Sequence, residues 1–205
     1  MADFDAFILA AGVSSRMGAK NKLLLDWHGV PLVTHVVQCY LNALEGKVAV
    51  VTGFEADRVT DTLKGLPVTI FHNAAFDTGQ QSSVVTALRQ PSSTAATLIG
   101  LGDQPLLEPD DLRWLMAMHH AHDQKKITVP NRHGVRGNPI VIPASLRPRI
   151  LNDPRAPGCR RFTRDNPELV SNVESDRPGF FTDIDTPGDY ALLHPVDGGI
   201  HEAAS

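Results

Sequence analysis

A loop near the start of the chain combines glycine, serine and basic residues in a pattern suited to binding an anion. It spans Ala11 to Lys22 and follows an apolar run that predicts a buried strand. Gly12 and Gly18 can adopt positive φ angles, so the backbone can turn several N–H groups toward a ligand. Arg16 and Lys22 add cationic groups for phosphate oxygens. A solvated glycine loop with scattered charges is the alternative interpretation.

The elements that must position this loop alternate between apolar strands and helices. Short apolar runs predict strands at 4–10, 47–52, 67–71, 95–101, 127–129 and 140–142. Helical patterns lie at 31–44, 56–64, 81–89 and 108–122. This alternation predicts an α/β fold, a Rossmann-like, mostly parallel sheet with helices on both faces. We expect a single domain over 1–195 and a flexible C-terminal tail over 196–205.

Loops at the carboxyl ends of the predicted strands form the expected binding crevice, because ligands of open parallel sheets bind there. Besides the first loop, these positions hold Gly53 and the pair Gly102-Asp103. Asp103 suits a Mg²⁺ ligand, since magnesium takes few carboxylates together with phosphate oxygens. A turn-forming aspartate before proline is the alternative. Gly53 either leaves room for a base or forms a simple turn.

Two further aspartates lie near the C-terminus. Asp183 and Asp185 alternate in a segment that we interpret as a strand, so both side chains should point to one face. Asp185 is the better candidate for a second magnesium ligand, while Asp183 stays open between a metal ligand and a structural residue. Thr186 and Pro187 should begin a helix, with Thr186 as its N-cap.

Other polar side chains lie in three segments. Ser82 and Ser83 open a predicted helix, where they either contact a base or ribose or cap the helix. Arg136 and Asn138 lie in a glycine-containing stretch that suits a bound phosphate monoester, or else forms a solvated hairpin. The three arginines at 160, 161 and 164 either reach that ligand or form an exposed helix face.

Composition excludes several classes of protein. The 205 residues are 42% hydrophobic and carry a formal net charge of −4, which argues against nucleic-acid binding. The first apolar run is too short to span a membrane and no signal-peptide pattern precedes it, so we expect a cytoplasmic protein. Cys39 and Cys159 lack metal or redox spacing. We interpret the histidines of the helix end near residue 120 as cations at a helix C-terminus: His119, His120 and His122.

The opening segment resembles the MobA-like nucleotidyltransferase family. The pattern LAAGxSxRMGxxK, followed by LL, G and PL, starts at Leu9. The resemblance continues through Gly-Asp-Gln-Pro, Arg-Gly-Asn-Pro and Asp-Ile-Asp-Thr-Pro and covers nearly the whole chain to Tyr190. It departs at Gln80-Gln81, where the family often has Met-Gly. It implies catalytic roles for Lys22, Arg16 and Asp103, and Mg²⁺ binding by Asp103 and Asp185. It also implies acceptor contacts from Arg136 and Asn138, and nucleotide contacts from Leu9, Ala10, Ala11, Gly12, Ser14, Gly18, Gly53, Ser82 and Ser83.

The activity that the resemblance implies is transfer of a nucleoside monophosphate from an NTP to a phosphorylated acceptor, with release of pyrophosphate. The Leu-Ala-Ala-Gly sequence favours CTP, and the motif set is similar to the molybdenum cofactor cytidylyltransferase branch. The expected reaction is therefore CMP transfer to the phosphate of molybdopterin. A xanthine dehydrogenase-type molybdoenzyme is the implied partner. Because an acceptor phosphate is largely ionised near pH 7, no general base is required.

Three alternatives remain open. The chain could transfer GMP to molybdopterin, or a nucleotide to a sugar or another phosphorylated metabolite. It could also be a carrier that holds the cofactor for a molybdenum hydroxylase without catalysis, although paired acidic residues argue against this. A dinucleotide-dependent oxidoreductase is disfavoured, because the first loop lacks GxGxxG and no acidic ribose-binding residue follows at the expected spacing.

Overall fold

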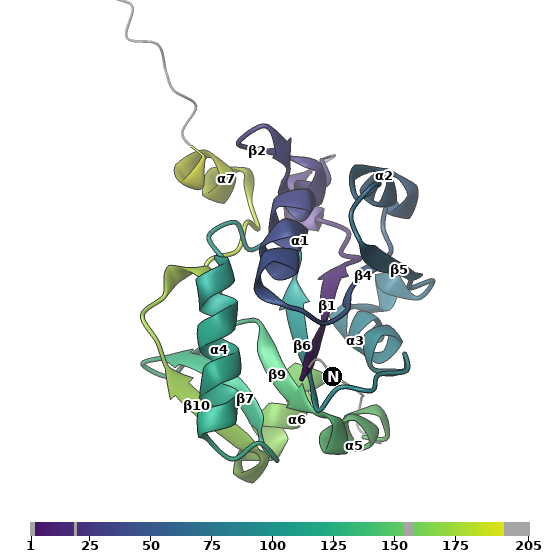
Figure 1. Cartoon of the computed structure of the whole chain (residues 1–205). Helices are drawn as coiled ribbons and strands as arrows, with labels where there is room; N and C mark the ends of the chain where they lie inside the picture. Colours follow the sequence, from purple (N-terminus) through teal and green to yellow (C-terminus); the bar gives the residue numbers. More distant parts are fainter. Residues whose placement is uncertain (1–2, 19, 154–157, 195–205) are drawn as a thin grey trace, which may run out of the picture.

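The central feature of the fold is a mixed sheet in which the strands of one half are parallel (Figure 1). The computed structural model describes residues 3–18, 20–153 and 158–194. The parallel strands are β6 (Ala96–Leu101), β1 (Phe4–Ala10), β4 (Val48–Thr52) and β5 (Val68–His72), in that spatial order. The mostly parallel sheet of the sequence-based prediction is thus confirmed. The expected C-terminal tail, 196–205, lies outside the described residues.

The other half of the sheet contains the antiparallel pairings. β9 (Ile140–Pro143) runs antiparallel to both β6 and β7 (Ile127–Arg132). β10 (Val170–Glu174) is parallel to β7, and the short β8 (Val135–Arg136) pairs antiparallel with β7. A separate hairpin joins β2 (Asp26–Trp27) to β3 (Val30–Pro31). The sequence patterns predicted none of β2, β3, β8 and β10, because these strands are short or lack an apolar run.

Helices cover both faces of the sheet. One face packs against α1 (Leu32–Ala43), α2 (Ala56–Thr62) and α4 (Pro109–Ala121). The opposite face packs against α3 (Gln80–Leu88), α5 (Arg147–Leu151) and α6 (Cys159–Asp165). α7 (Pro187–Leu193) ends the described chain. Within the described residues, six short 3₁₀ turns connect these elements: η1 (Ser15–Met17), η2 (Lys22–Leu24), η3 (Phe76–Thr78), η4 (Ala144–Leu146), η5 (Pro167–Leu169) and η6 (Pro178–Phe180).

The burial of β1 on both faces explains its continuous apolar sequence. Ala6 and Ile8 belong to the core cluster beneath α1 and α4, whereas Phe7 and Leu9 belong to the cluster beneath α3, α5 and α6. A strand covered on both sides has no solvent face that polar residues could occupy. β1 therefore holds a fixed place in the middle of the sheet, with the loop that follows it at one end.

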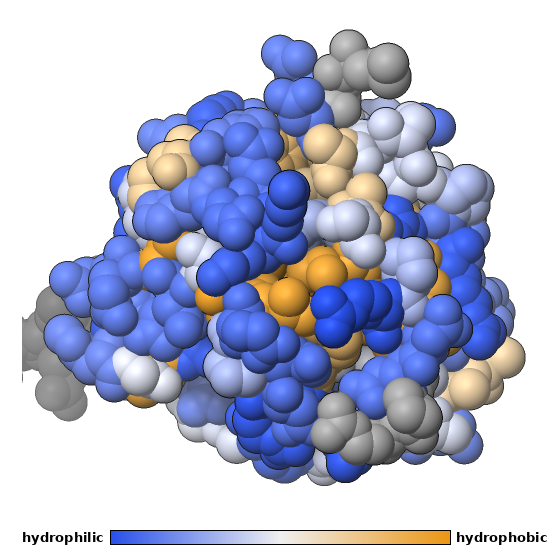
Figure 2. All heavy atoms as spheres, turned by 90° about the horizontal axis from the view of Figure 1, so that it is seen from below, coloured by the Kyte–Doolittle hydropathy of each residue, from blue (hydrophilic) through white to orange (hydrophobic). Residues whose placement is uncertain are grey.

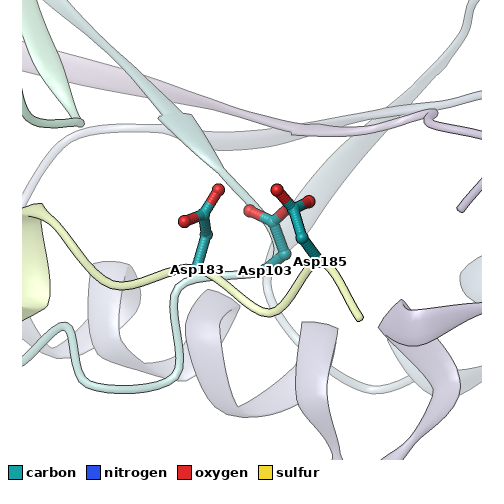
Figure 3. A group of neighbouring side chains, drawn as sticks. All are labelled: Asp103, Asp183 and Asp185. Atoms are coloured by element: carbon teal, nitrogen blue, oxygen red, sulfur yellow. The ribbon is translucent and has the colours of Figure 1, made fainter. Parts of the chain in front are cut away.

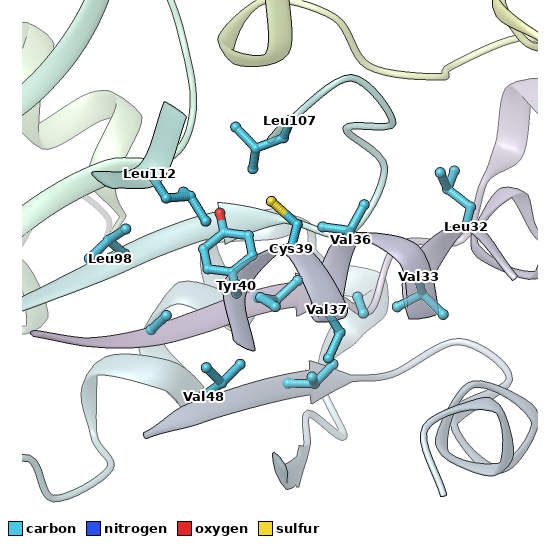
Figure 4. Close-up of a cluster of buried hydrophobic side chains, with 14 of the residues drawn as sticks. Leu32, Val33, Val36, Val37, Cys39, Tyr40, Val48, Leu98, Leu107 and Leu112 are labelled. Atoms are coloured by element: carbon cyan, nitrogen blue, oxygen red, sulfur yellow. The ribbon is translucent and has the colours of Figure 1, made fainter. Parts of the chain in front are cut away.

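Tyr40 of α1 is fully buried in the core cluster beneath α1 and α4, among aliphatic side chains (Figure 4). Its hydroxyl lies against β6 at Gly100, where a Cβ atom would collide with it. Glycine at this strand position is therefore required by packing, although glycine normally weakens a strand. Burial raises the pKa of Tyr40 well above its usual value.

The interpretation of His119 as a cation at the end of a helix is wrong. Its side chain is buried, 3% exposed, and its Nδ1 lies 2.8 Å from the hydroxyl of Thr128. Burial, aided by the charge of His120, lowers the pKa of His119 to about 4. The folded protein thus holds this imidazole neutral, because α4 turns it into the core instead of toward the helix end.

This neutral histidine makes the folded state sensitive to acid. An unfolded histidine titrates near its ordinary pKa, so stability is full above that value and falls as pH drops toward 4. The total loss should be about 3 kcal/mol, from about 1.4 kcal/mol per pKa unit. Urea unfolding between pH 7 and 4 should show a smaller loss in His119→Gln than in the wild type. The exposed His72→Gln control should keep the wild-type slope, and identical slopes in all three proteins would contradict this account.

Figure 2 shows the molecule from below the view of Figure 1, where apolar side chains lie in a hollow bordered by polar ones. A separate hollow near the start of β1 is lined by residues such as Phe4, Leu44 and Met116. The pockets described next lie at the opposite, carboxyl end. Among the described residues, every helix is too short or too polar to cross a lipid bilayer.

Candidate active site

Two adjoining pockets open at the carboxyl ends of β1 and β6. The first has a volume of about 290 Å³ and the second of about 390 Å³. Arg16, Asp103 and Asp185 line both pockets, so the two spaces meet at these side chains. The expectation that the loops after β1 and β6 face one crevice is thus confirmed, in agreement with the general rule for open α/β sheets. Gly53, of the third loop expected there, lines neither of these two pockets.

The loop after β1 forms one wall of the first pocket. Ser14 has a left-handed conformation with φ of 51°, and Gly18 has φ of 67°. The Ser14 carbonyl accepts a hydrogen bond from the Met17 N–H at 2.8 Å, and the Ser14 hydroxyl accepts one from the Lys22 N–H at 3.3 Å. The Met17 side chain is buried and anchors the loop. These contacts fix the course of the loop and place Lys22 beside the pocket.

Three carboxylates meet where the two pockets join. Asp103 follows β6, whereas Asp183 and Asp185 come from the segment before α7, and Figure 3 shows the three side chains directed to the same side. Each offers one oxygen, and the three oxygens lie within 4.8 Å of one another. Among the described residues, Asp103 Oδ1 is buried and has no hydrogen-bond partner. Such a set of hard oxygen ligands fits a divalent cation such as Mg²⁺.

Two basic side chains neutralise part of this charge. Lys22 Nζ lies 2.6 Å from Asp103 Oδ2 and 2.8 Å from Asp185 Oδ1. Arg16 places a guanidinium nitrogen 2.7 Å from Asp185 Oδ2. Lys22 is only 13% exposed, while Arg16 is 65% exposed. The lysine is therefore an enclosed member of the cluster, whereas the arginine joins it from the solvent side, where a ligand can reach it.

The pKa values follow from this balance of burial and charge. Burial lowers the pKa of Lys22, but Asp103 and Asp185 outweigh it, so the pKa lies above its usual value. Burial acts to raise the pKa of Asp185, yet Lys22 and Arg16 hold it below the usual range. Burial and then the two neighbouring carboxylates raise the pKa of Asp183. The cluster thus keeps a charged lysine against carboxylates of unequal acidity.

Gln104 holds together the chain segments that carry the site. It is 2% exposed, and its amide nitrogen donates hydrogen bonds to the carbonyls of Asn138 at 3.0 Å and Gly179 at 3.1 Å. The Ile184 N–H donates to the Asp103 carbonyl at 3.0 Å. These bonds join the loop after β6 to the segment of Asp183 and Asp185, which is distant in sequence.

The segment of Asp183 and Asp185 is irregular, so the prediction of a strand there is wrong. Its backbone bonds to the loop after β6 and to the start of α7 instead of to a neighbouring strand. Asp189 Oδ2 accepts hydrogen bonds from the N–H groups of Asp185 at 3.1 Å and Thr186 at 2.8 Å, and the Thr186 hydroxyl accepts one from the Asp189 N–H. The prediction of Thr186 as an N-cap is confirmed. This capping box fixes the backbone at Asp185.

Five of the nine predicted nucleotide-binding residues line the first pocket: Leu9, Ala11, Gly12, Ser14 and Ser83. Ala10 packs in the core, and Gly18 shapes the loop. Gly53 packs closely against Ala11 and Phe76. A Cβ at residue 53 would lie only 2.8 Å from the Ala11 Cβ and 2.5 Å from the Phe76 Cβ. The Ser82 hydroxyl donates to the carbonyls of Ala75 and Gly79. Ala10, Gly53 and Ser82 thus support the pocket walls, and their predicted nucleotide contacts stay predictions.

The two predicted acceptor-binding residues, Arg136 and Asn138, both line the second pocket. The Arg136 guanidinium contacts the hydroxyl of Thr163 in α6. Arg160 and Arg161 of α6 line the same pocket, whereas Arg164 lines only a neighbouring hollow. The sequence left open whether the α6 arginines reach the acceptor or form an exposed helix face. Two of the three, Arg160 and Arg161, line the pocket, and Arg164 does not.

Sequence reasoning missed part of the first pocket. Phe76, Asp77 and Gln80 line it, and all three follow β5. The rule that placed the other loops at strand ends applies equally to β5, so this signal was present in the sequence. The sequence also left the role of Asp183 open. Its place in the carboxylate cluster depends on a contact between segments that are distant in sequence.

The family relationship is decided by comparison with known proteins. Residues 6–171 match the model of the MobA-like NTP transferase domain. The chain belongs to this family. As a MobA-like protein it is a nucleotidyltransferase. Its candidate active-site residues line the cleft between β1, β6 and the segment before α7.

Individual relatives span nearly all of the chain. A molybdenum cofactor cytidylyltransferase from Escherichia coli (strain K12) is 26% identical over 93% of this chain and 95% of its own. A nicotine blue oxidoreductase from Paenarthrobacter nicotinovorans is 28% identical over 87% and 90%. Among solved structures, a nucleotidyl transferase from Methanothermobacter thermautotroptrophicus is similar, with a TM-score of 0.78 and 26% identity over 93% of this chain and 95% of that chain.

Proposed function

We propose that this MobA-like protein transfers CMP from CTP to the phosphate of molybdopterin, or of the molybdenum cofactor, and releases pyrophosphate. The observation that carries the proposal is the junction of the two pockets at Asp103 and Asp185. A transfer reaction needs a donor and an acceptor held side by side in the right geometry, and two joined pockets can hold one of them each. The choice of CTP and molybdopterin is supported by the Leu-Ala-Ala-Gly sequence and by the full-length similarity to a molybdenum cofactor cytidylyltransferase.

The first pocket is proposed to hold the nucleotide. Its backbone wall at Gly12 and Ser14 suits the triphosphate, and Arg16 and Lys22 offer cationic groups to phosphate oxygens. An acceptor phosphate oxygen in the second pocket would then bond to the α-phosphorus. The bond between the α-phosphorus and the bridging oxygen breaks, and pyrophosphate leaves with that electron pair. The protein provides positioning and charge, which are the main requirements of phosphoryl-group chemistry.

The metal that we propose is Mg²⁺, held by Asp103 and Asp185 with Asp183 beside them. The spacing of the three oxygens and the buried, partnerless Asp103 Oδ1 fit a hard cation. When bound, the ion supplies positive charge against the developing negative charge of the phosphates. Lys22 contributes to the same neutralisation from the protein side, because its ammonium contacts both carboxylates.

A nucleotide and acceptor panel tests the proposal. Purified protein is mixed with Mg²⁺, one of CTP, GTP, ATP or UTP, and either molybdopterin or a sugar phosphate, and pyrophosphate is measured. We expect release with CTP and molybdopterin. Pyrophosphate release with GTP and molybdopterin, but not with CTP, would show that GTP is the nucleotide substrate. Pyrophosphate release only with a sugar phosphate would show that molybdopterin is not the acceptor.

The remaining alternatives are decided by the same protein preparation. Tight binding of molybdopterin without pyrophosphate from any NTP would favour the carrier. Because one relative is named as an oxidoreductase, oxidation of NADH or NADPH is followed in parallel by its absorbance. The three carboxylates at the pocket junction favour nucleotidyl transfer over hydride transfer, since carboxylates and a divalent ion stabilise phosphates.

A further inference from the structure

Asn73 is a buried amide behind the wall of the first pocket. It directly follows β5, and its backbone N–H donates to the Thr52 carbonyl at 2.8 Å, so the pairing of β4 with β5 holds it in place. The residue is 3% exposed and does not line the pocket itself. Its side chain contacts Ser82 and Ser83 in the first turn of α3, and Ser83 does line the pocket. Asn73 can therefore act on a ligand only through Ser83.

The hydrogen bonds of the Asn73 amide decide which of its ends is the donor. Its Oδ1 accepts a hydrogen bond from the Ala75 N–H at 3.0 Å. Because a backbone N–H can only donate, the end of the amide beside it is the oxygen. The amide nitrogen therefore faces the two serine hydroxyls, with Ser82 Oγ at 2.8 Å and Ser83 Oγ at 3.0 Å. Both hydroxyl oxygens accept a hydrogen from Asn73.

The two serine hydroxyls differ in where their own hydrogens go. The Ser82 hydroxyl donates to the carbonyls of Ala75 and Gly79, at 2.8 Å each. Ser83 is 3% exposed, and within the described part of the chain its hydroxyl bonds to Asn73 alone. Asn73 supplies the hydrogen of that bond, so the hydrogen of the Ser83 hydroxyl is left for the pocket. A buried donor without an acceptor is costly, which favours a ligand that offers an acceptor here.

The direction of the Ser83 hydrogen matters for a nucleobase and not for a sugar. Ribose hydroxyls can both donate and accept, whereas the ring positions of a base have fixed polarity. N3 of cytosine is an acceptor, and N3 of uracil carries a hydrogen. Since the loop after β1 is the wall proposed for the triphosphate, the wall that contains Phe76, Gln80 and Ser83 is left for the nucleoside.

We propose that Asn73 is a positioning residue that fixes the Ser83 hydroxyl as a hydrogen-bond donor, and that this donor selects cytosine over uracil at N3. The inference rests on the proposed function for the nucleotide in the first pocket, whereas the polarity of Ser83 follows from the hydrogen bonds alone. When uracil takes the place of cytosine, a donor meets a donor and both buried hydrogens lack an acceptor. Sites built on hydrogen bonds reject such mismatches more strongly than shape alone does.

Equilibrium binding of CTP and UTP tests the role of Asn73 without turnover. Each nucleotide is titrated by calorimetry into protein with Mg²⁺ and no acceptor, at about pH 8, where a carboxyl group is ionised. The wild type should bind CTP about tenfold more tightly than UTP, the size of one unsatisfied buried donor. Asn73→Asp replaces the donating nitrogen with an accepting oxygen, so the Ser83 hydroxyl should turn its hydrogen away from the pocket. The preference should then reverse, with UTP about tenfold tighter than CTP.

Two further variants control for charge and for folding. Asn42→Asp adds the same charge at an exposed position of α1 and should keep the wild-type ratio of CTP to UTP affinity. Ser83→Ala removes the hydroxyl and leaves Asn73 in place, so its ratio should fall to about one. The melting temperature of each variant shows whether it is folded.

The ratio of the two affinities separates a positioning role from a merely structural one. If Asn73 only supported the fold, its substitution would weaken both nucleotides together and leave the ratio unchanged. Equal binding of CTP and UTP by the wild type, or the wild-type ratio in Ser83→Ala, would overturn the inference. Absence of pyrophosphate release from every nucleotide and acceptor would overturn the proposed function, and the affinity ratio would still decide the role of Ser83.

Discussion

Asp103→Asn should lower the rate of pyrophosphate release by about 10³-fold, since metal-ion stabilisation of a transition state is worth several kcal/mol. The side chain has one oxygen 2.6 Å from Lys22 Nζ and another that is buried without a partner. Asparagine keeps the shape of aspartate and removes the charge that a divalent ion requires. The measurement is kcat with the NTP and acceptor that the panel identifies, together with the melting temperature of each protein.

Asp110→Asn is the matched control for that substitution. Asp110 lies on α4, is 77% exposed and pairs only with the neighbouring Arg113 among the described residues. We expect its turnover to equal that of the wild type. If Asp103→Asn also retains turnover while its melting temperature is normal, the carboxylate cluster is not the catalytic centre.

Lys22→Met should change metal binding and turnover in opposite directions. Without nucleotide, the ammonium of Lys22 already contacts Asp103 and Asp185, so a divalent ion must compete with a like charge. Removal of the ammonium should tighten Mn²⁺ binding by about tenfold, a small part of the few kcal/mol between two charges about 4 Å apart near a protein surface. Turnover should fall by about 10²-fold, because a group that stabilises developing charge is lost.

Thermal unfolding with and without Mn²⁺ measures the first half of that prediction. An ion that binds only the folded state raises the melting temperature, and tighter binding raises it further. The rise should be larger for Lys22→Met than for the wild type, and Lys64→Met, at an exposed ion pair on the surface, should behave as the wild type. An equal or smaller rise in Lys22→Met would show that Lys22 and the ion do not share the carboxylates.

The parallel strands, the loop after β1 and the position of Asp103 follow from local sequence patterns. β1 is buried on both faces, so its seven residues are almost all apolar, and the strand with its following loop is visible in the sequence. Asp103 was placed for the same reason, because it comes directly after the buried β6. The end of a parallel strand is a position that composition and order along the chain can define.

The second half of the site depends on contacts that no local pattern shows. Asp183 and Asp185 alternate as in a strand, yet a bond from Ile184 to the Asp103 carbonyl and the cap of α7 fix them in an irregular segment. Arg160 lies on the short helix α6, whose Cys159 and Phe162 are buried in the core cluster on that face of the sheet. The buried Gln104 joins these parts, and nothing in its neighbourhood along the chain predicts three distant carbonyl partners.

The most direct test is a crystal structure of the protein with CTP and Mn²⁺, in which the anomalous signal locates the metal. The account predicts a metal peak among the oxygens of Asp103 and Asp185, and a triphosphate along the loop from Gly12 to Gly18 in the first pocket. A nucleotide bound elsewhere on the sheet, or a metal peak away from both aspartates, would contradict it.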